Sequence, residues 1–310
     1  MRRRLVLSGL AGALLPARPA AACALREQGR VPVEIAGGSL LVDVKINGHP
    51  ARMILDTGAQ RSLIQTAALR RLELEQDSSA AASVRGIGGT ERHRIALPRS
   101  LSLGGIPLAR RTLARDMSLT VGTLARPGIG TATGGGQPVD GLLGRDLLSA
   151  FDLDLDLRAR SLGLFAVTDC RSVVPPWAGG FVTVPTQAPM DTAIQLAIDI
   201  DGTRLRALLD TGAAATVIAA PGMARLGVSP ALLEQDRKIT LSGVGPRITE
   251  ARLHRFRTLR VGDITIDDPR ILMAPIQVIP IVDVLLGSDF LVNRRTWISF
   301  ATRELHIAPA

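Results

Sequence analysis

The chain has 310 residues, and its 37 lysines and arginines outnumber its 28 acidic residues to give a formal net charge of +9. Apolar residues make up 46% and charged residues 21%, a globular balance that excludes a disordered or low-complexity protein. The length predicts two domains. The content of glycine (31) and proline (19) favours a turn-rich, all-β fold, and two cysteines are too few for a disulfide scaffold or a four-cysteine zinc site.

The N-terminus has the pattern of an export signal. Arginines at 2–4 precede an apolar stretch at 5–15, and alanines at 20–22 offer a small-residue cleavage site. We therefore expect residues 1–22 to be a signal peptide and the protein to be exported, to the periplasm or outside the cell. The choice between the general and the twin-arginine route stays open. No apolar run reaches the roughly 18 residues of a membrane span, so no transmembrane segment is predicted.

Cleavage after residue 22 would make Cys23 the first residue and, by removing four arginines, lower the net charge to +5. Cys23 could then carry a lipid anchor, or it could form a disulfide with Cys170 in an oxidising compartment. The sequence favours the disulfide, because alanine stands where a lipoprotein signal usually has leucine.

An internal repeat sets the domain organisation. Each copy starts with alternating apolar residues typical of a half-buried strand, turns through Asn-Gly or Asp-Gly, and returns as an apolar strand ending in Asp. Further blocks follow in the same order. The matched segments are 42–64 with 196–218, 86–89 with 243–246, 101–108 with 259–266, 140–148 with 283–291, and 153–165 with 297–307. The sequence therefore predicts two homologous β-rich lobes with few short helices, at 23–167 and 181–310, joined by a linker at 168–180.

The most informative repeated residues surround the two Asp-Thr-Gly elements. Each element follows an apolar strand, has a hydroxyl six residues past the Asp (Ser62, Thr216), and is followed downstream by Leu-Leu-Gly. In duplicate this constellation resembles the aspartic peptidases, specifically the retropepsin-like family, as two tandem domains covering nearly all of the chain after residue 22. The resemblance implies an all-β fold of two β-barrel lobes related by a pseudo-twofold axis.

The resemblance also implies an endopeptidase that cuts polypeptides without a cofactor, with Asp56 and Asp210 as its catalytic pair. Two carboxylates about 3 Å apart cannot both ionise, so they share one proton. The ionised one takes a proton from water while the other donates to the peptide carbonyl, which is general acid–base catalysis. We expect a monomer, because both lobes lie in one chain.

Further roles follow from the same resemblance. The threonines brace the opposite loop, the glycines after them let the backbone approach the carboxylates, and the glycines of Leu-Leu-Gly are structural. The supporting residues are Thr57, Gly58, Ala59, Thr211, Gly212 and Ala213, and the structural ones are Gly144 and Gly287. A hydroxyl in place of Ala59 or Ala213 would favour the charged carboxylate. Without it we expect an optimum at mildly acidic to near-neutral pH.

Glycine-rich segments resemble the flap that closes over substrate in this family. The flap residues are Gly86, Ile87, Gly88 and Gly89 in lobe 1 and Gly243, Val244 and Gly245 in lobe 2. Flexible glycines suit a lid that opens and shuts. A generic glycine-rich hairpin is the alternative, and Pro246 departs from the pattern in lobe 2.

Other kinds of site find little support. The four histidines have no metal-binding spacing, and the acidic run at 152–156 lacks the Gly and Glu of a calcium loop, so we interpret it as an alternating strand with a polar face. Aromatic residues at 3% provide no stacking platform for nucleic acid, although a preference for acidic substrates stays open. Two rival hypotheses remain: a non-catalytic peptide-binding or scaffolding module on the same fold, and an enzyme whose lobes pair between chains.

Overall fold

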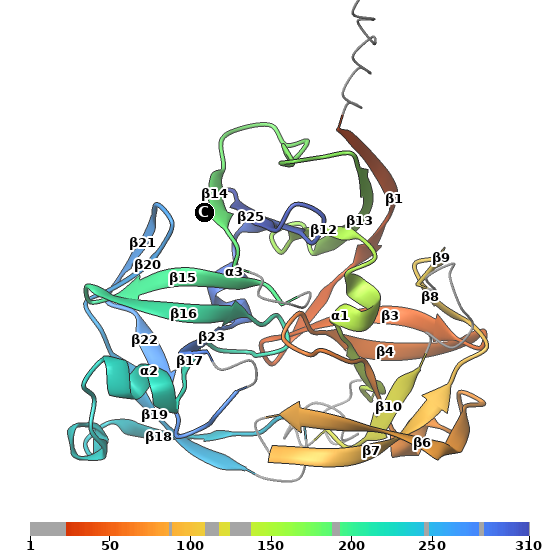
Figure 1. The fold of residues 1–310 in the computed structure, drawn as a ribbon, viewed down its shortest axis with the longest axis horizontal. Coiled ribbons are helices and arrows are strands. Elements are labelled where there is room, and N and C mark those ends of the chain that lie inside the picture. The colour runs from red at the N-terminus through yellow and green to blue at the C-terminus, as the bar shows by residue number, and fades with distance from the viewer. Residues whose placement is uncertain are drawn as a thin grey trace, which may run out of the picture.

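The fold is all-β, with two lobes and a third sheet that both lobes share (Figure 1). The structure, a computed structural model, describes residues 23–86, 89–108, 118–124, 138–187, 193–244, 248–278 and 282–309. Helices among these residues are short: α1 (Arg145–Leu148), α2 (Ala220–Arg225), α3 (Ser288–Leu291), η1 (Thr66–Ala68) and η3 (Pro230–Leu233). Residues 1–22, where we expect the signal peptide, lie outside the described residues.

The lobe 1 sheet runs in the order β6-β7-β10-β5-β11-β4-β3-β8-β9, with β2 beside β3. Its strands are β2 (Glu34–Ala36), β3 (Ser39–Ile46), β4 (His49–Leu55), β5 (Leu63–Gln65), β6 (Glu75–Gly86), β7 (Gly89–Leu97), β8 (Leu101–Leu103), β9 (Ile106–Pro107), β10 (Leu119–Gly122) and β11 (Gly141–Leu143).

The lobe 2 sheet repeats that path in the order β18-β19-β22-β17-β23-β16-β15-β20-β21. Its strands are β15 (Gln195–Ile200), β16 (Thr203–Leu209), β17 (Val217–Ile218), β18 (Arg237–Leu241), β19 (Thr249–Arg255), β20 (Thr258–Val261), β21 (Ile264–Asp267), β22 (Arg270–Met273) and β23 (Val284–Leu286). The hairpins β3–β4 and β15–β16 turn through residues of positive φ, Asn47 and Gly48 in one and Asp201 and Gly202 in the other, as a type I′ turn requires.

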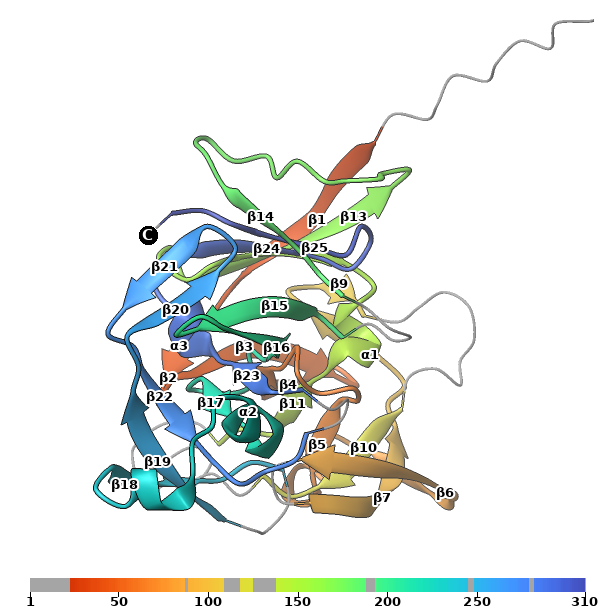
Figure 2. The ribbon, with the colours of Figure 1, turned by 60° about the vertical axis from the view of Figure 1, so that its left-hand side comes forward.

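The shared sheet takes three strands from each half of the chain, in the order β1-β13-β12-β24-β25-β14 (Figure 1 and Figure 2). Its strands are β1 (Ala24–Pro32), β12 (Asp152–Asp156), β13 (Ser161–Thr168), β14 (Val182–Pro185), β24 (Arg295–Ser299) and β25 (Glu304–Ile307). The closing strand of each repeat therefore leaves its own lobe and pairs with the closing strand of the other. The lobes are joined by main-chain hydrogen bonds as well as by the linker.

The register at the centre of this sheet reflects the duplication. Strands β12 and β24 are antiparallel, with Asp154 opposite Trp297. Each of these residues lies ten positions after the glycine of its own Leu-Leu-Gly element, Gly144 or Gly287. Equivalent residues of the two repeats thus face each other, so the pseudo-twofold axis passes through this pair.

The acidic run forms the strand β12 with its aspartates on one face, as the sequence predicts, but this polar face is turned away from solvent. Asp152 is only 2% exposed and Asp154 is 0% exposed. The linker covers this side of the sheet, and Trp177 from the linker donates its indole N–H to Asp154 (3.1 Å). Arg295 and Arg30 pair with the same carboxylate at 2.6 and 2.8 Å. The aspartates are buried because cations and N–H donors from distant segments satisfy them.

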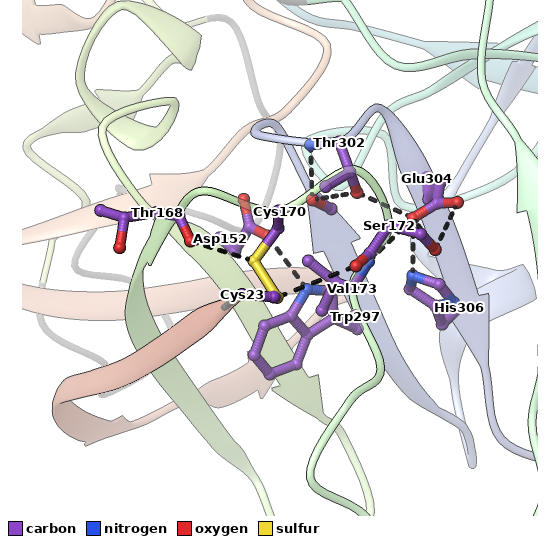
Figure 3. Close-up of a disulfide and its surroundings, with 11 residues drawn as sticks. Cys23, Asp152, Thr168, Cys170, Ser172, Val173, Trp297, Thr302, Glu304 and His306 are labelled. Carbon is purple, nitrogen blue, oxygen red and sulfur yellow. Dashed lines mark hydrogen bonds and ion pairs between the residues drawn. A yellow bond between two sulfur atoms is a disulfide. The ribbon is translucent and has the colours of Figure 1, made fainter. Parts of the chain in front are cut away.

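A disulfide joins Cys23, which directly precedes β1, to Cys170 in the linker (Figure 3). It closes a covalent loop across 147 residues and ties the start of β1 to the end of β13. A lipid on Cys23 would require the same sulfur, so the two fates of Cys23 that the sequence left open exclude each other. Nearby, Ser172 donates to the carboxylate of Glu304 at 2.9 Å, which anchors the linker to β25.

One hydrophobic core runs through both lobes and one side of the shared sheet. Leu153 and Leu155 of β12, which alternate with the buried aspartates, point into this core and are 0% exposed. Ile298 of β24 and Leu148 of α1 join it. The shared sheet thus supports the ends of both lobes and holds them in a fixed relation.

Candidate active site

The two Asp-Thr-Gly elements lie where the lobes meet, at the ends of equivalent strands. Strand β4 runs parallel to β11 and β16 runs parallel to β23, so each Asp leaves its strand beside a Leu-Leu-Gly element. The main-chain N–H of Asp56 donates to Leu143 O and that of Asp210 to Leu286 O, both at 2.9 Å. We call residues 56–62 and 210–216 the catalytic loops, in anticipation of the role that the sequence predicts.

The two threonines interlock across the lobe boundary. Thr57 N donates to the Thr211 hydroxyl (2.9 Å), and Thr211 N donates to the Thr57 hydroxyl (3.1 Å). Each hydroxyl in turn donates to a carbonyl of the opposite lobe, Thr57 to Leu209 O (2.9 Å) and Thr211 to Leu55 O (2.7 Å). Both side chains are completely buried. The four bonds fix the relative position of the catalytic loops.

Glycine at the third position allows each loop to approach the other lobe's aspartate. A Cβ atom added to Gly58 would overlap the carboxyl group of Asp210, and one added to Gly212 would overlap that of Asp56. This reciprocal contact places the two carboxyl groups on either side of the pseudo-twofold axis. No residue with a side chain fits at either glycine without displacing a carboxylate.

Main-chain N–H groups point at both carboxylates. Ala59 N donates to Asp56 Oδ1 (2.7 Å), while Gly212 N and Ala213 N donate to Asp210 Oδ1 (both 3.0 Å). Both aspartates are partly exposed. The groups are therefore held by backbone donors and remain accessible to solvent, which suits residues that exchange protons with water or substrate.

Beneath each catalytic loop lies a second carboxylate that the sequence interpretation missed. Asp146 accepts from the N–H and the hydroxyl of Ser62 (2.9 and 2.7 Å), and that hydroxyl accepts from Gly144 N (2.9 Å). Burial raises the pKa of Asp146 above its ordinary value, and the bonds from Ser62 only partly offset this. The signal for it was in the sequence, because an Asp follows Leu-Leu-Gly by two positions in both repeats.

Lobe 2 repeats the arrangement with a threonine. Thr216 N and its hydroxyl donate to Asp289 at 2.8 and 2.7 Å, and Gly287 N donates to the Thr216 hydroxyl at 3.2 Å. A Cβ on Gly144 or Gly287 would lie 2.7 or 2.5 Å from a main-chain carbon of the adjacent catalytic loop. These glycines permit the close packing of Leu-Leu-Gly beneath the loop.

The residue after Leu-Leu-Gly breaks the symmetry. In lobe 1 it is Arg145, which is 1% exposed and donates to Thr57 O (3.0 Å) and Gly58 O (2.9 Å). In lobe 2 it is Ser288, whose hydroxyl donates to Gly38 O in lobe 1 (2.6 Å). A buried cation thus supports the Asp56 loop, whereas a neutral hydroxyl occupies the equivalent place in lobe 2.

The predicted flaps fall at hairpins, although only part of each is described. In lobe 1, Gly86 and Gly89 pair across the end of the β6–β7 hairpin, and Ile87 and Gly88 lie outside the described residues. In lobe 2, Gly243 and Val244 follow β18, and Gly245 lies outside them.

Val244 forms a contact between lobes that the sequence did not predict. It makes a β-bridge with Leu124 of lobe 1 and packs against a buried group that we call the lobe 1 apolar cluster. The lobe 1 apolar cluster consists of Leu41, Ile54, Leu63, Val139 and Leu142. Ala59, next to Asp56 on the catalytic loop, packs against the same cluster. The lobe 2 hairpin therefore reaches over to the side of lobe 1 that carries Asp56.

Other binding features are not evident in the described part of the chain. No three acidic, histidine or cysteine residues gather there as a metal site, and none of the helices described has the length and hydropathy needed to cross a membrane.

Comparison with known proteins agrees with the geometry. A search of curated proteins found no match. A family model described as aspartyl protease matches the chain twice, at residues 42–147 and 196–290. The two matches cover one catalytic loop and one Leu-Leu-Gly element each, and together they span more than half of the chain. The chain therefore belongs to the aspartyl protease family, as two tandem retropepsin-like domains.

Proposed function

We propose that the protein is an aspartic endopeptidase in which Asp56 and Asp210 act together on a substrate held between the lobes. The observation that carries the proposal is the reciprocal contact at the loops, where Gly58 lies against the Asp210 carboxyl and Gly212 against that of Asp56. Carboxylates brought this close share one proton, because their like charges disfavour double ionisation.

The chemistry follows from one shared proton. The ionised carboxylate removes a proton from a water molecule, whose oxygen attacks the peptide carbonyl carbon, while the protonated carboxyl donates its proton to the carbonyl oxygen. The tetrahedral intermediate then collapses: the carboxyl that took the water proton passes it to the nitrogen, the C–N bond breaks, and a hydroxyl of the intermediate returns its proton to the other carboxylate, which restores the starting state of the dyad. The backbone donors at Ala59, Gly212 and Ala213 orient the carboxylates throughout.

We further propose that one chain forms the complete site. The threonine interlock and the shared sheet both join the two lobes of one chain, which supports an active monomer over pairing between chains. The disulfide at Cys23 fits the export that the N-terminal sequence predicts, since disulfides persist in oxidising compartments.

A peptide-cleavage experiment tests the function. Protein lacking residues 1–22 is incubated with a diverse peptide library across about pH 3–8, with and without pepstatin, and products are identified by mass spectrometry. Asp56→Asn and Asp210→Asn should each lose at least about a hundredfold in kcat, because each removes one half of the acid–base pair. Asp263→Asn, an exposed aspartate in the β20–β21 turn, is the matched control and should keep full activity.

The outcomes separate the hypotheses. If the unmodified protein binds peptides but cuts none, the non-catalytic binding module is correct. If either active-site variant stays active, a shared dyad is wrong. Sedimentation of the active protein at the mass of one chain is expected, and activity only in a dimer would favour lobes that pair between chains.

A further inference from the structure

Arg61 stands at the end of the lobe 1 catalytic loop, five residues past Asp56. Ser62 turns its hydroxyl toward Asp146, and the next residue, Leu63, belongs to the lobe 1 apolar cluster. Arg61 itself lies in a bend before β5, so we infer from the internal repeat that it shares the side of Leu63. The equivalent residue of lobe 2 supports this placement, since Ala215 packs against a cluster that contains Val217, the counterpart of Leu63.

The guanidinium of Arg61 retains unused hydrogen-bonding capacity. Its Nη2 donates to the Ser118 hydroxyl (2.5 Å), and its Nη1 makes no hydrogen bond to the described residues, whereas its Nε is shielded from solvent and out of a ligand's reach. The ion pairs found in that part of the chain do not include Arg61. Asp146 lies near enough to feel its charge, yet accepts its bonds from Ser62. A permanently charged group beside the catalytic loop is thus left with donors for a ligand.

The two halves of the site differ at this position. Lobe 2 has Ala215, which offers neither charge nor donors, in the place of Arg61. The lobe 2 hairpin reaches this same side of lobe 1 through Val244, so a chain held under that hairpin would pass along the lobe 1 apolar cluster.

We propose that Arg61 is a specificity-determining residue, which makes the protein prefer an acidic substrate side chain on one side of the scissile bond only. This proposal rests on the proposed peptidase function. A planar guanidinium recognises a carboxylate by paired, charge-assisted hydrogen bonds. The protein would then favour acidic peptides whose acidic residue lies at one defined distance from the cut.

The test uses a peptide that the protein already cuts. Each residue within four positions of the scissile bond is replaced in turn by Glu or Gln, and kcat/KM is measured near pH 6, where the glutamate is ionised. In unmodified protein, kcat/KM should be about ten times higher with Glu than with Gln at one position, on one side of the scissile bond. Arg61→Gln should bring the ratio close to one, and Arg61→Lys should retain part of it. Arg257→Gln, at a side chain that is 83% exposed on lobe 2, should change nothing.

Both kcat/KM values in each Glu to Gln ratio are measured on the same preparation. A smaller folded fraction in a variant therefore lowers both values equally and leaves the ratio unchanged. An equal ratio in unmodified protein and Arg61→Gln would falsify the proposal while leaving the peptidase function intact. Failure of the unmodified protein to cut any peptide would instead reject the function. Should Arg61→Gln be inactive, Ala215→Arg decides the question: a new acidic preference on the opposite side of the cut supports the proposal, and its absence overturns it.

Discussion

Contacts with the opposite lobe determine which residues can occupy the key positions of the catalytic loops. Thr57 and Thr211 each use their N–H and hydroxyl across the boundary, and each glycine that follows lies against the other lobe's aspartate. No polar atom in this group could be removed without leaving a buried partner unsatisfied, which costs about 1–3 kcal/mol per group. Each Thr-Gly pair completes its hydrogen bonds and its packing only against the Asp-Thr-Gly element of the other lobe, so both copies are required.

The alanines after Thr-Gly predict the pH dependence of activity. Ala59→Ser and Ala213→Ser place a hydroxyl beside a carboxylate, where donation favours the ionised form. The acidic limb of the kcat/KM profile should therefore move to lower pH in each variant and further in the double variant. Unmodified protein should work best at mildly acidic to near-neutral pH. The comparison is a pH–rate profile with one peptide, and a pepsin-like acidic optimum in unmodified protein contradicts the expectation.

Strands β12 and β24 have a different task, since they hold the lobes together through a buried charge. Burial of Asp154 by itself raises its pKa, but the hydrogen bonds and charges of Arg295 and Arg30 outweigh burial and hold the pKa below its ordinary value of 3.8. A carboxyl whose pKa is lowered on folding stabilises the protein above its unfolded pKa. That stability is lost as the pH falls below about 3.8 through the lowered value.

Asp154→Asn should lower the free energy of unfolding by about 2–4 kcal/mol near neutral pH, because two arginines lose their shared partner. The lower end reflects the partial exposure of both arginines, 34% and 31%. Urea titrations at several pH values measure the effect. The loss should shrink toward acid pH, where Asp154 of the unmodified protein becomes protonated. Asp43→Asn, at an aspartate that is 69% exposed and paired with Arg52, is the control and should cost under about 1 kcal/mol.

In the whole molecule the shared sheet and the disulfide turn two repeats into one unit. Strands from both ends of the chain meet in this sheet, so neither lobe can leave without breaking the β12–β24 pairing. The Cys23–Cys170 bond then ties β1, the outermost strand on the lobe 1 side, to the linker. The catalytic loops receive their fixed geometry from this assembly.

Removing the disulfide tests its contribution to stability. Cys23→Ser/Cys170→Ser should lose about 2–4 kcal/mol, because the bond closes a long loop in the unfolded chain. Thermal unfolding should show a lower Tm, and a reductant should lower the Tm of unmodified protein but leave that of the double variant unchanged. Peptide cleavage at low temperature should persist in the variant, since the disulfide touches neither catalytic loop. An unchanged Tm on reduction would contradict a structural role.

The sequence by itself determined the repeat, the all-β class and the family, because those depend on local patterns: alternation, Asn-Gly turns and Asp-Thr-Gly after an apolar strand. It also placed Asp56 and Asp210 in equivalent positions. Only the tertiary structure decided that Asp152 and Asp154 are buried, since their partners Trp177, Arg295 and Arg30 come from segments far apart in the chain. The burial of Arg145 against the carbonyls of Thr57 and Gly58 belongs to the same class. A charged residue looks alike in sequence whether it meets water, a carbonyl or a carboxylate, and tertiary packing alone tells these cases apart.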